Sequence, residues 1–343
     1  MTVHRTIAQR AADPAGPGPE LSVVVLSYNG ERWIDEQLRS ILGQDGPPAE
    51  IVLADDGSTD GTLDVAEAVL RGAEAPFRIV TRDAPLGVAG NAWHAVGLTG
   101  GRFIAFADQD DAWLPGKTAR LLPLLREDPR ALLVHSDARL VDERGRLLEP
   151  SLFASLQISA REWADYAGQR QLAALVRRNL VTGATMIVRR ELALRAGPAP
   201  EPWIHDEWLA VAAALTNGIR TVREPLVAYR QHGGNQIGQR TPSLADKIRK
   251  ALGPGAADQA RKARRAAALA ERCRELGASD GQEAMLRRKA AHERERDRLP
   301  VRRLARLPRV LGWWARGAYG EYSRGAQDVA RDLLQSRREG PCT

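Results

Sequence analysis

The amino-acid sequence predicts an α/β fold: a doubly wound, mostly parallel sheet with helices on both faces, followed by a helical C-terminal region. Apolar β-branched runs alternate with amphipathic stretches through residues 21–128, a pattern typical of βαβ units. After about residue 240 the strand patterns stop, and the chain becomes rich in Ala and Arg with helical spacing. We therefore expect three parts: a disordered segment at 1–19, an α/β domain at 20–240 and a basic helical region at 241–343.

The first strands and helices follow one another in regular order. Residues 1–19 are rich in Ala, Pro and Gly, a composition that favours disorder. Residues 21–27 (LSVVVLS) form a β-branched run, which predicts a buried strand. In residues 30–44 apolar side chains recur at helical spacing, which predicts the first helix. The alternation continues with expected strands at 50–55, 75–83 and 101–108 and expected helices at 60–72 and 87–98.

Beyond residue 111 the pattern is mixed. Pro115 opens a predicted helix at 115–128, where the missing N–H of proline sacrifices no helical hydrogen bond. Strands are then expected at 131–143 and 184–190, and a further helix at 205–218. The helical C-terminal region is broken by glycines near residue 254 and by two prolines, Pro300 and Pro308.

Composition excludes several classes of protein. The chain has 343 residues, of which 43% are hydrophobic and 27% charged, a balance typical of globular proteins. Two cysteines are too few for a disulfide scaffold or a cysteine-based zinc site. The longest apolar uncharged stretch, 208–219, is shorter than the ~20 residues that span a bilayer. Residues 1–20 lack the apolar core of a secretory signal, so we expect a cytoplasmic protein.

Polar side chains follow three of the expected strands. They are Ser27, Tyr28 and Asn29 after the first strand, Asp55 and Asp56 at the end of the second, and Asp108, Gln109, Asp110 and Asp111 after the fourth. In open parallel sheets, ligands bind beyond the carboxyl ends of the strands. We therefore expect the three clusters to meet at one edge of the sheet and to form a binding site.

The last of these clusters places three carboxylates within four positions. Like charges this close repel one another, and a divalent cation bound beside them relieves the repulsion. Mg²⁺ and Mn²⁺ prefer such oxygen ligands, and Mg²⁺ commonly combines one or two carboxylates with substrate phosphates. The alternative is a plain strand-to-helix turn with Asp111 near the cap of the next helix, which accounts for only one of the carboxylates.

Two common phosphate-binding loops are absent from the sequence, because there is no G-x-G-x-x-G after the first strand and no Walker A loop. A nucleotide would instead be held by its base in a pocket and by its diphosphate at the metal. Tyr28 offers a stacking face, although ordinary partly buried packing is an alternative for this residue. Asp55 or Asp56 can accept a hydrogen bond from a ring N–H of the base.

Five segments in this order resemble glycosyltransferase family 2, and most of all its bacterial rhamnosyltransferase-like branch. They span about residues 21–240 and are VVVLSYNGERWIDEQLRSILGQ, EIVLADDGSTDGT, GRFIAFADQDDAWLPGK, HDEWLAV and YRQHGGNQIG. The resemblance implies a GT-A fold for a catalytic domain at 20–240, a nucleotide-sugar donor and an inverting mechanism. It also implies a divalent cation, Mn²⁺ or Mg²⁺, as cofactor.

The resemblance also implies roles for single residues. Asp108-Gln109-Asp110 matches the DXD motif of the family, in which Asp110 would meet the metal and Asp108 would lie near the ribose and the metal. Asp55 matches the acidic residue that pairs with a pyrimidine base, and Asp206 stands where the family has its catalytic base. His232 matches a histidine that completes the metal shell in some relatives, whereas the alternative is a solvent-exposed loop histidine.

General chemistry supports an acidic site of this kind. Glycosyl transfer needs a stabilised leaving diphosphate, which a divalent ion provides, and an acceptor hydroxyl activated by a carboxylate base. Asp206 is the preferred base and Glu207 the alternative, although acidic residues at a helix start also complement the helix dipole. His205 is expected to be a local structural partner. Asn91 is expected to reach the donor nucleotide, and residues 182–185 either line the sugar site or form a tight turn.

The resemblance suggests dTDP-rhamnose as the donor, with UDP-sugars as alternatives. The expected acceptor is a glycan or lipid-linked glycan in cell-surface polysaccharide synthesis. Two competing interpretations are a nucleotidyltransferase that makes a nucleotide-sugar and a non-catalytic nucleotide-sugar-binding protein. Nucleotidyltransferases usually show a Gly-rich basic loop near the first strand, which SYNGERW does not match. The presence of both Asp110 and Asp206 argues against a binding protein.

Charge is distributed unevenly along the chain. Residues 241–343 carry 24 basic and 13 acidic side chains, whereas the whole chain has a net charge of +7. Arginines surround aromatic residues in 301–322, which predicts peripheral contact with the inner face of the cell membrane. The alternatives are that the aromatics pack on the catalytic domain, that they form a dimer contact, or that the charge is a solvated helical surface. No nucleic-acid recognition motif is present, so no nucleic-acid partner is expected.

Overall fold

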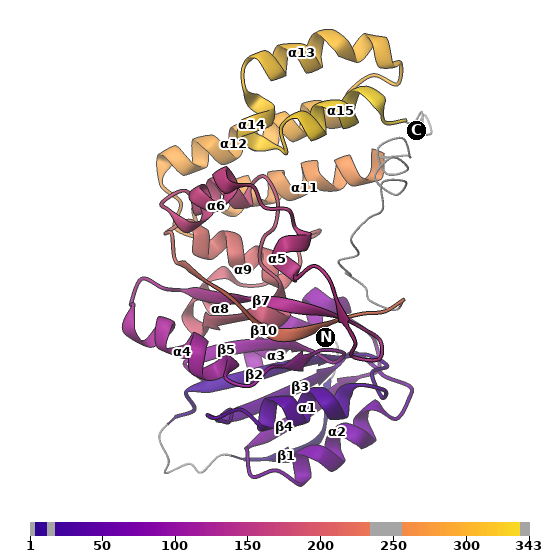
Figure 1. The fold of residues 1–343 in the computed structure, drawn as a ribbon, viewed down its shortest axis with the longest axis vertical. Coiled ribbons are helices and arrows are strands. Elements are labelled where there is room, and N and C mark those ends of the chain that lie inside the picture. The colour runs from indigo at the N-terminus through magenta and orange to yellow at the C-terminus, as the bar shows by residue number, and fades with distance from the viewer. Residues whose placement is uncertain (1–3, 12–17, 234–255, 337–343) are drawn as a thin grey trace.

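The structure is a computed structural model, and it describes residues 4–11, 18–233 and 256–336. Within these residues an α/β domain is built around one sheet, and the C-terminal helices are stacked at one end of the long axis of the molecule (Figure 1). The domain boundary expected near residue 240 lies in the segment 234–255, outside the described residues.

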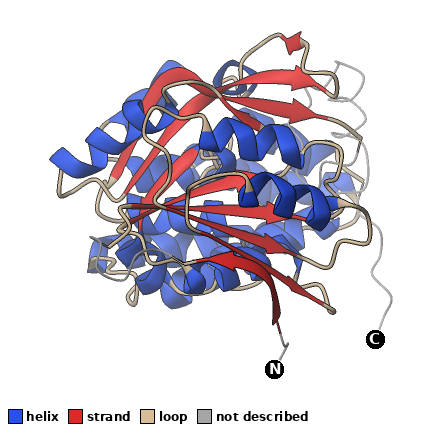
Figure 2. Cartoon of the chain, turned by 90° about the horizontal axis from the view of Figure 1, so that it is seen from below, coloured by secondary structure: helices blue, strands red, loops and turns tan. Residues whose placement is uncertain are grey.

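A ten-stranded mixed sheet runs through the α/β domain (Figure 2). The strands lie in the order β1-β4-β3-β2-β5-β9-β7-β10-β6, and β8 pairs with β7. Their bounds are β1 His4–Arg10, β2 Leu21–Ser27, β3 Glu50–Asp55, β4 Phe77–Arg82, β5 Phe103–Asp108, β6 Ala112–Trp113, β7 Leu133–Asp142, β8 Leu147–Leu148, β9 Met186–Arg189 and β10 Ile219–Gln231.

The strands that carry the polar clusters are parallel. β4, β3, β2 and β5 run in the same direction, and β10 is parallel to β7. By contrast, β9 runs antiparallel between β5 and β7, and the edge strands β1 and β6 are antiparallel to their neighbours. The carboxyl ends of β2, β3 and β5 therefore meet at one edge, as expected for a ligand site.

Helices cover both faces of the sheet, because successive side chains of a strand point to opposite faces. On one face Val23 and Val25 of β2 belong to a core with α1, α2 and α4. On the other face Val24 and Leu26 belong to a core with α3, α8 and α9. The bounds in this domain are α1 Ile34–Leu42, α2 Thr62–Arg71, α3 Gly87–Leu98, α4 Lys117–Glu127, α5 Leu152–Ser155, α6 Ala160–Ala167, α7 Gln171–Leu175, η1 Gly183–Thr185, α8 Arg190–Ala196 and α9 His205–Ala214.

The predicted fold class is confirmed, with two differences in detail. The expected disorder at the N-terminus is wrong for residues 4–10, which form β1 antiparallel to β4. Backbone pairing with β4 holds this segment at the edge of the sheet. Because the segment buries little apolar surface, its amino-acid composition does not predict a strand. The long strand β10 was also not predicted, because charged residues and Pro225 interrupt its apolar pattern.

The first two C-terminal helices pack directly against the α/β domain. These two helices are α11 and α12. The helices of the C-terminal region are α11 Ala256–Arg272, α12 Asp280–Asp297, η2 Arg303–Arg306, α13 Leu307–Ala315, α14 Ala318–Tyr322 and α15 Ala326–Leu334. Leu269, Cys273 and Leu276 join the same core as α9. Trp203 Nε1 donates a hydrogen bond to the Arg265 carbonyl at 2.9 Å, which fixes α11 beside the start of α9.

Two arginines of the C-terminal region are buried and structural. The Arg296 guanidinium contacts Asp332 at 2.7 Å and Glu293 at 3.1 Å, and Tyr319 donates its hydroxyl to the same Asp332. The Arg306 guanidinium donates to backbone carbonyls, including that of Asp332 at 2.8 Å. Buried charges require such partners. Part of the basic character of this region therefore serves its own folding.

Candidate active site

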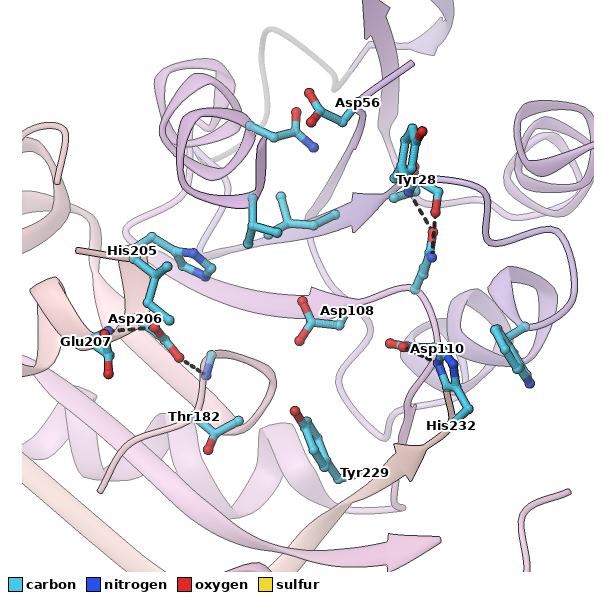
Figure 3. A pocket seen from close by; sticks show the side chains of 18 of the residues that line it. Tyr28, Asp56, Asp108, Asp110, Thr182, His205, Asp206, Glu207, Tyr229 and His232 are labelled. Atoms are coloured by element: carbon cyan, nitrogen blue, oxygen red, sulfur yellow. Dashed lines mark hydrogen bonds and ion pairs between the residues drawn. The ribbon is translucent and has the colours of Figure 1, made fainter. Parts of the chain in front are cut away.

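A cavity of about 720 Å³ opens at the carboxyl ends of β2 and β5 (Figure 3). The loop after β2 contributes Tyr28, the turn after β5 contributes Asp110, α9 contributes Asp206, and β10 and its end contribute Tyr229 and His232. Of the predicted site residues, the cavity lining contains Ser27, Tyr28, Asn29, Asp56, Asn91, Asp108, Gln109, Asp110, Asp206 and His232. The sheet edge therefore gathers nearly the whole predicted set.

The acidic turn after β5 contributes two carboxylates to the cavity. Burial raises the pKa of Asp108 to about 7, and the charges of Asp110 and Asp206 add to this rise. Asp110 Oδ2 lies 2.7 Å from His232 Nε2. The His232 ring also stacks on Trp33, with ring centroids 4.2 Å apart, so this histidine is part of a packed wall. Carboxylates that repel one another in this way favour a bound cation.

The third carboxylate of the turn, Asp111, has a structural role. It is buried, and its Oδ1 accepts a hydrogen bond from the Arg230 backbone N–H at 2.9 Å, which joins the turn to β10. The next helix, α4, begins only at Lys117, so Asp111 does not cap it. Burial, together with the neighbouring carboxylates, raises the pKa of Asp111 well above its usual range. The segment is a turn between β5 and β6, and the helix cap that the alternative explanation gave to Asp111 is not formed.

The donor atoms fit a divalent cation that is shared with a phosphate ligand. No group of three His, Cys, Asp or Glu side chains is arranged as a metal site within the part of the chain that the structure describes. Asp110 and His232 are nevertheless adjacent, and Asp108 lines the same cavity. Mg²⁺ is usually held by one or two carboxylates, with substrate phosphates and water completing its shell. Asp110, Asp108 and His232 are the residues that would hold the ion.

Asp206 lies in the first turn of α9, on the wall across the cavity from the Asp110–His232 pair (Figure 3). Its Oδ2 accepts a hydrogen bond from the Gly183 N–H at 3.0 Å, and its Oδ1 accepts one from the Glu207 N–H at 2.6 Å. Burial raises the pKa of Asp206 to about 6, although these hydrogen bonds oppose the rise. A fixed carboxylate with a pKa near neutrality suits a general base.

The neighbouring carboxylate, Glu207, is engaged in an ion pair. Its Oε2 lies 2.7 Å from the Arg265 guanidinium of α11. Burial raises the pKa of Glu207, and the positive charge of Arg265 counteracts this effect. Since a carboxylate held by arginine is a weaker base, the geometry favours Asp206 over Glu207.

His205 is buried in the cavity wall, and neither ring nitrogen has a hydrogen-bond partner among the described residues. Its ring instead contacts that of Phe106, with centroids 4.9 Å apart. Burial lowers the pKa of His205 to about 4, so the imidazole is neutral at ordinary pH. Within the described residues His205 thus packs against Phe106 and makes no side-chain hydrogen bond.

The loop after β2 is clamped by Gln109. Gln109 Oε1 accepts from the Tyr28 backbone N–H at 2.7 Å, and Gln109 Nε2 donates to the Tyr28 carbonyl at 2.9 Å. A Cβ atom at Gly30 would meet the Gln109 amide oxygen at 2.1 Å, so the loop approaches closely because residue 30 is glycine. Tyr28 itself is 45% exposed, which leaves its ring available for stacking. Gln109 thus shapes this end of the cavity by holding the backbone of Tyr28.

Two further residues of the predicted site, Asn29 and Asn91, connect neighbouring segments of the chain. Asn29 has a positive φ of 50°, and its Oδ1 accepts from the Thr59 N–H at 2.9 Å. Asn91 Nδ2 donates to the Ala54 carbonyl at 2.7 Å, and its Oδ1 accepts from Arg82 at 3.0 Å. Both residues line the cavity while their side chains connect neighbouring segments.

The prediction that Asp55 contacts the base requires correction. Asp55 is completely buried and absent from the cavity lining, and its oxygens accept hydrogen bonds from side chains that include Ser27 and Thr81. The adjacent Asp56 lines the cavity, and its carboxylate accepts from the backbone N–H groups of Leu86 and Gly87, both at 2.8 Å. Of these two aspartates, Asp56 is therefore the one that lines the cavity.

Half of the chain, including much of the cavity lining, matches a known family. Residues 22–193, half of the chain, match the family described as glycosyl transferase family 2. The chain belongs to glycosyltransferase family 2. The match contains the loop after β2, the acidic turn after β5 and the segment of Thr182 and Gly183, so the family region carries most of the cavity.

Relatives within glycosyltransferase family 2 are distant in sequence. The chain is 28% identical over 226 residues to the dTDP-rhamnosyl transferase RfbG of Shigella flexneri, covering 62% of this chain and 73% of RfbG. It is 28% identical over 229 residues to a glycosyltransferase of Nostoc sp., covering 63% of this chain and 66% of that protein. These alignments span about two thirds of this chain and of its relatives.

Solved structures confirm the GT-A glycosyltransferase fold. The mannosyltransferase PcManGT of Pyrobaculum calidifontis, solved with GDP-Man and Mn²⁺, is 21% identical with a TM-score of 0.52, over 93% of this chain and 79% of that one. Residues 1–349 of S. aureus TarS, solved with UDP-GlcNAc, are 19% identical with a TM-score of 0.52, over 92% and 90% of the two chains. At these identities the likeness concerns the fold alone.

Some residues of this family 2 site were not singled out from the sequence. They are Arg32, Trp33, Glu143, Asn179 and Tyr229, all of which line the cavity. Tyr229 stands three residues before His232 in the segment YRQHGG, so its position beside a metal-binding candidate was a usable signal. Asn179 and Glu143 lie in segments without a distinctive pattern, and only the folded chain brings them to the cavity.

The elevated pKa of Asp206 leads to a prediction for the pH dependence of this family 2 member. A general base acts when deprotonated, so we expect kcat/KM to fall as the pH drops through about 6 and to level off above it. The assay is release of the nucleoside diphosphate at saturating divalent cation, which keeps Asp108 ionised. The Glu207→Gln variant should retain the same acidic limb. A flat profile between pH 5 and 8 would contradict the assignment.

A second prediction concerns the clamp on Tyr28. The Gln109→Ala variant removes two hydrogen bonds, each of which contributes about 1 kcal/mol. We therefore expect nucleoside diphosphate affinity, measured by calorimetric titration, to fall roughly tenfold. Gln327→Ala, which changes an exposed glutamine of α15, is the matched control. Unchanged affinity in Gln109→Ala would show that Tyr28 keeps its position without the clamp.

Proposed function

We propose that this chain is a metal-dependent, inverting glycosyltransferase that moves a sugar from a nucleotide-sugar to a glycan or lipid-linked glycan acceptor. One observation carries the proposal: Asp206 and the Asp110–His232 pair line a single cavity, with Asp108 between them (Figure 3). One side of such a cavity can hold the diphosphate, and the other can activate an acceptor hydroxyl. Its volume of about 720 Å³ is within the usual range for small-molecule sites.

We assign the leaving group to the Asp110 side of the cavity. A divalent cation bound there supplies Lewis-acid stabilisation of the negative charge that develops on the diphosphate. Asp108, whose carboxylate is buried beside Asp110, would orient the ribose end of the donor. Tyr28 and Asp56 provide a stacking face and a hydrogen-bond acceptor for the base.

We assign the acceptor to the Asp206 side of the cavity. Asp206 takes the proton of the acceptor hydroxyl while that oxygen bonds to the anomeric carbon and the bond from this carbon to the diphosphate breaks. Attack from the face opposite the leaving group inverts the anomeric configuration and needs no enzyme nucleophile. The hydrogen bonds from Gly183 and Glu207 hold the carboxylate in one orientation for this step.

The donor that we propose first is dTDP-rhamnose. The family 2 match and the similarity to the Shigella dTDP-rhamnosyl transferase support this choice, and UDP-sugars are the next candidates. We propose cell-surface polysaccharide synthesis as the setting, as the family resemblance of the sequence implies. The acidic residues at the cavity suit a donor whose diphosphate is bound together with a cation.

A donor screen tests the proposal. The purified chain is incubated with Mn²⁺ and labelled dTDP-rhamnose, UDP-glucose, UDP-galactose or GDP-mannose, and both hydrolysis and transfer to lipid-linked or glycan acceptors are measured. We expect turnover with one of these donors and a product of inverted configuration by NMR. Formation of nucleotide-sugar from a nucleoside triphosphate would instead indicate a nucleotidyltransferase, and donor binding without turnover would indicate a binding protein.

A further inference from the structure

The segment from η2 to α13 exposes a stripe of apolar side chains. Leu304, Leu307, Leu311 and Trp314 follow one another at intervals of three and four residues, which places them on one face of the helical segment. They are 80%, 37%, 47% and 54% exposed, respectively. We call these four residues the α13 stripe. Four large apolar side chains on one exposed helical face indicate a contact surface.

The α13 stripe borders the side chain through which α13 packs on the C-terminal region. Val310 lies three residues after Leu307 and four before Trp314, so it borders the stripe, but it is completely buried and forms a small core with Leu299, Tyr319 and Val329. This small core already holds α13 on the C-terminal helices. The stripe therefore remains available to bind something outside the described part of the chain.

The surface around the stripe is strongly basic. Residues 298–320 contain six arginines and no acidic residue. Arg306 is buried and binds backbone carbonyls, whereas the others are exposed, namely Arg298, Arg302, Arg303, Arg309 and Arg316. No salt bridge joins any of these five to a described residue of the chain. Two copies of the chain meeting through this surface would bring like charges together, which disfavours a symmetric dimer.

Further positive charge lies beside Trp314. This residue also lines a cavity of about 550 Å³ between the C-terminal helices and the α6–α7 segment, together with Arg161, Arg170 and Arg177. Arg170 and Arg177 both contact Asp165, and Glu321 is the acidic residue in the lining. The three arginines outnumber these two carboxylates, so the cavity extends the basic surface.

We propose that the α13 stripe docks peripherally on an anionic lipid surface. Leucine and tryptophan side chains favour the boundary between head groups and acyl chains, and arginines beside them attract acidic head groups. None of the described helices is long and apolar enough to cross a bilayer, so the contact is one of surface binding. α13 lies at the end of the molecule away from the sheet (Figure 1). No residue of α13 lines the sheet-edge cavity, so docking through α13 leaves that cavity free.

Vesicle co-sedimentation of the full chain tests this proposal without any sugar donor. We expect the chain to bind vesicles of 70% phosphatidylcholine and 30% phosphatidylglycerol, to release them as salt screens the charges, and to ignore pure phosphatidylcholine. The double variant Arg309→Glu with Leu311→Ser should lower the partition coefficient at least about tenfold, since it reverses one charge and removes one inserting side chain.

The matched control is Leu194→Ser with Arg195→Glu, which changes one exposed leucine and one exposed arginine on α8. It should bind vesicles as the unaltered chain does, and both double variants should show unchanged thermal unfolding. Equal binding to neutral vesicles, or no binding to anionic ones, would overturn the proposal. Self-association that is lost in Arg309→Glu/Leu311→Ser, without vesicle binding, would instead identify the stripe as an interface between copies.

Discussion

Replacing Asp110 with alanine is expected to reduce sugar transfer by about a thousandfold or more. Asp110 Oδ2 lies 2.7 Å from His232 Nε2, and the two side chains are adjacent donors on the cavity wall. A divalent ion that stabilises the leaving diphosphate contributes several kcal/mol to the transition state, and each 1.36 kcal/mol corresponds to a tenfold change in rate. Loss of the carboxylate should therefore abolish both turnover and cation-dependent donor binding.

The experiment combines kinetics with direct measurement of the metal. Manganese binding to the chain and the nucleoside diphosphate is followed by electron paramagnetic resonance, and turnover is followed in parallel. Asp45→Ala, which changes an exposed aspartate after α1, is the control and should behave as the unaltered chain. Full activity of the unaltered enzyme in excess chelator would refute metal dependence. An active Asp110→Ala variant with intact manganese binding would refute the role of this residue.

The second large effect is expected for Asp206→Asn, which keeps the shape of the side chain and removes its basicity. Loss of a positioned general base reduces rates by on the order of 10²–10⁴, and we expect a decrease of kcat in this range. Donor affinity should change little, because Asp206 lies on the acceptor side of the proposed site. Asp64→Asn, which alters an exposed carboxylate in the first turn of α2, is a matched control for effects on helix starts.

The Glu207→Gln variant tests which of the two carboxylates, Asp206 or Glu207, is the general base. Glu207 is bound to Arg265 at 2.7 Å, so this variant should lower the free energy of unfolding while retaining much of the activity. Thermal unfolding of each variant, measured beside kcat, keeps the chemical and structural effects apart. An inactive but stably folded Glu207→Gln together with an active Asp206→Asn would reverse the assignment of the base.

Much of the site could be predicted from the sequence because parallel strands bring their carboxyl ends to one edge. Tyr28, Asp108 and Asp110 directly follow β-branched or apolar runs, so the strand pattern alone placed them together. The choice between Asp55 and Asp56 could not be made in this way. Both follow β3 closely, and only the hydrogen bonds that bury Asp55 show which carboxylate lines the cavity.

The remaining differences depend on contacts between distant residues. β1 pairs with β4 through its backbone. The amino-acid composition of this segment does not indicate such a pairing. Arginine side chains are usually exposed at the protein surface. Arg296 and Arg306 are nevertheless buried, because Asp332 and backbone carbonyl groups lie close to them in the fold. The clamp between Gln109 and Tyr28 likewise joins residues 81 positions apart. Such contacts between distant residues can be identified only in the folded structure.

The ion pair between Arg265 and Glu207 has a consequence for how this chain can diverge. Arg265 belongs to α11, yet it supplies the counter-ion of a residue on the cavity wall. The family match, at residues 22–193, ends before both of them. A hybrid that received a C-terminal region from another lineage would inherit Glu207 without its arginine, leaving a second uncompensated carboxylate beside Asp206. We therefore expect a hybrid chain to keep this ion pair only when the C-terminal region is exchanged together with α9.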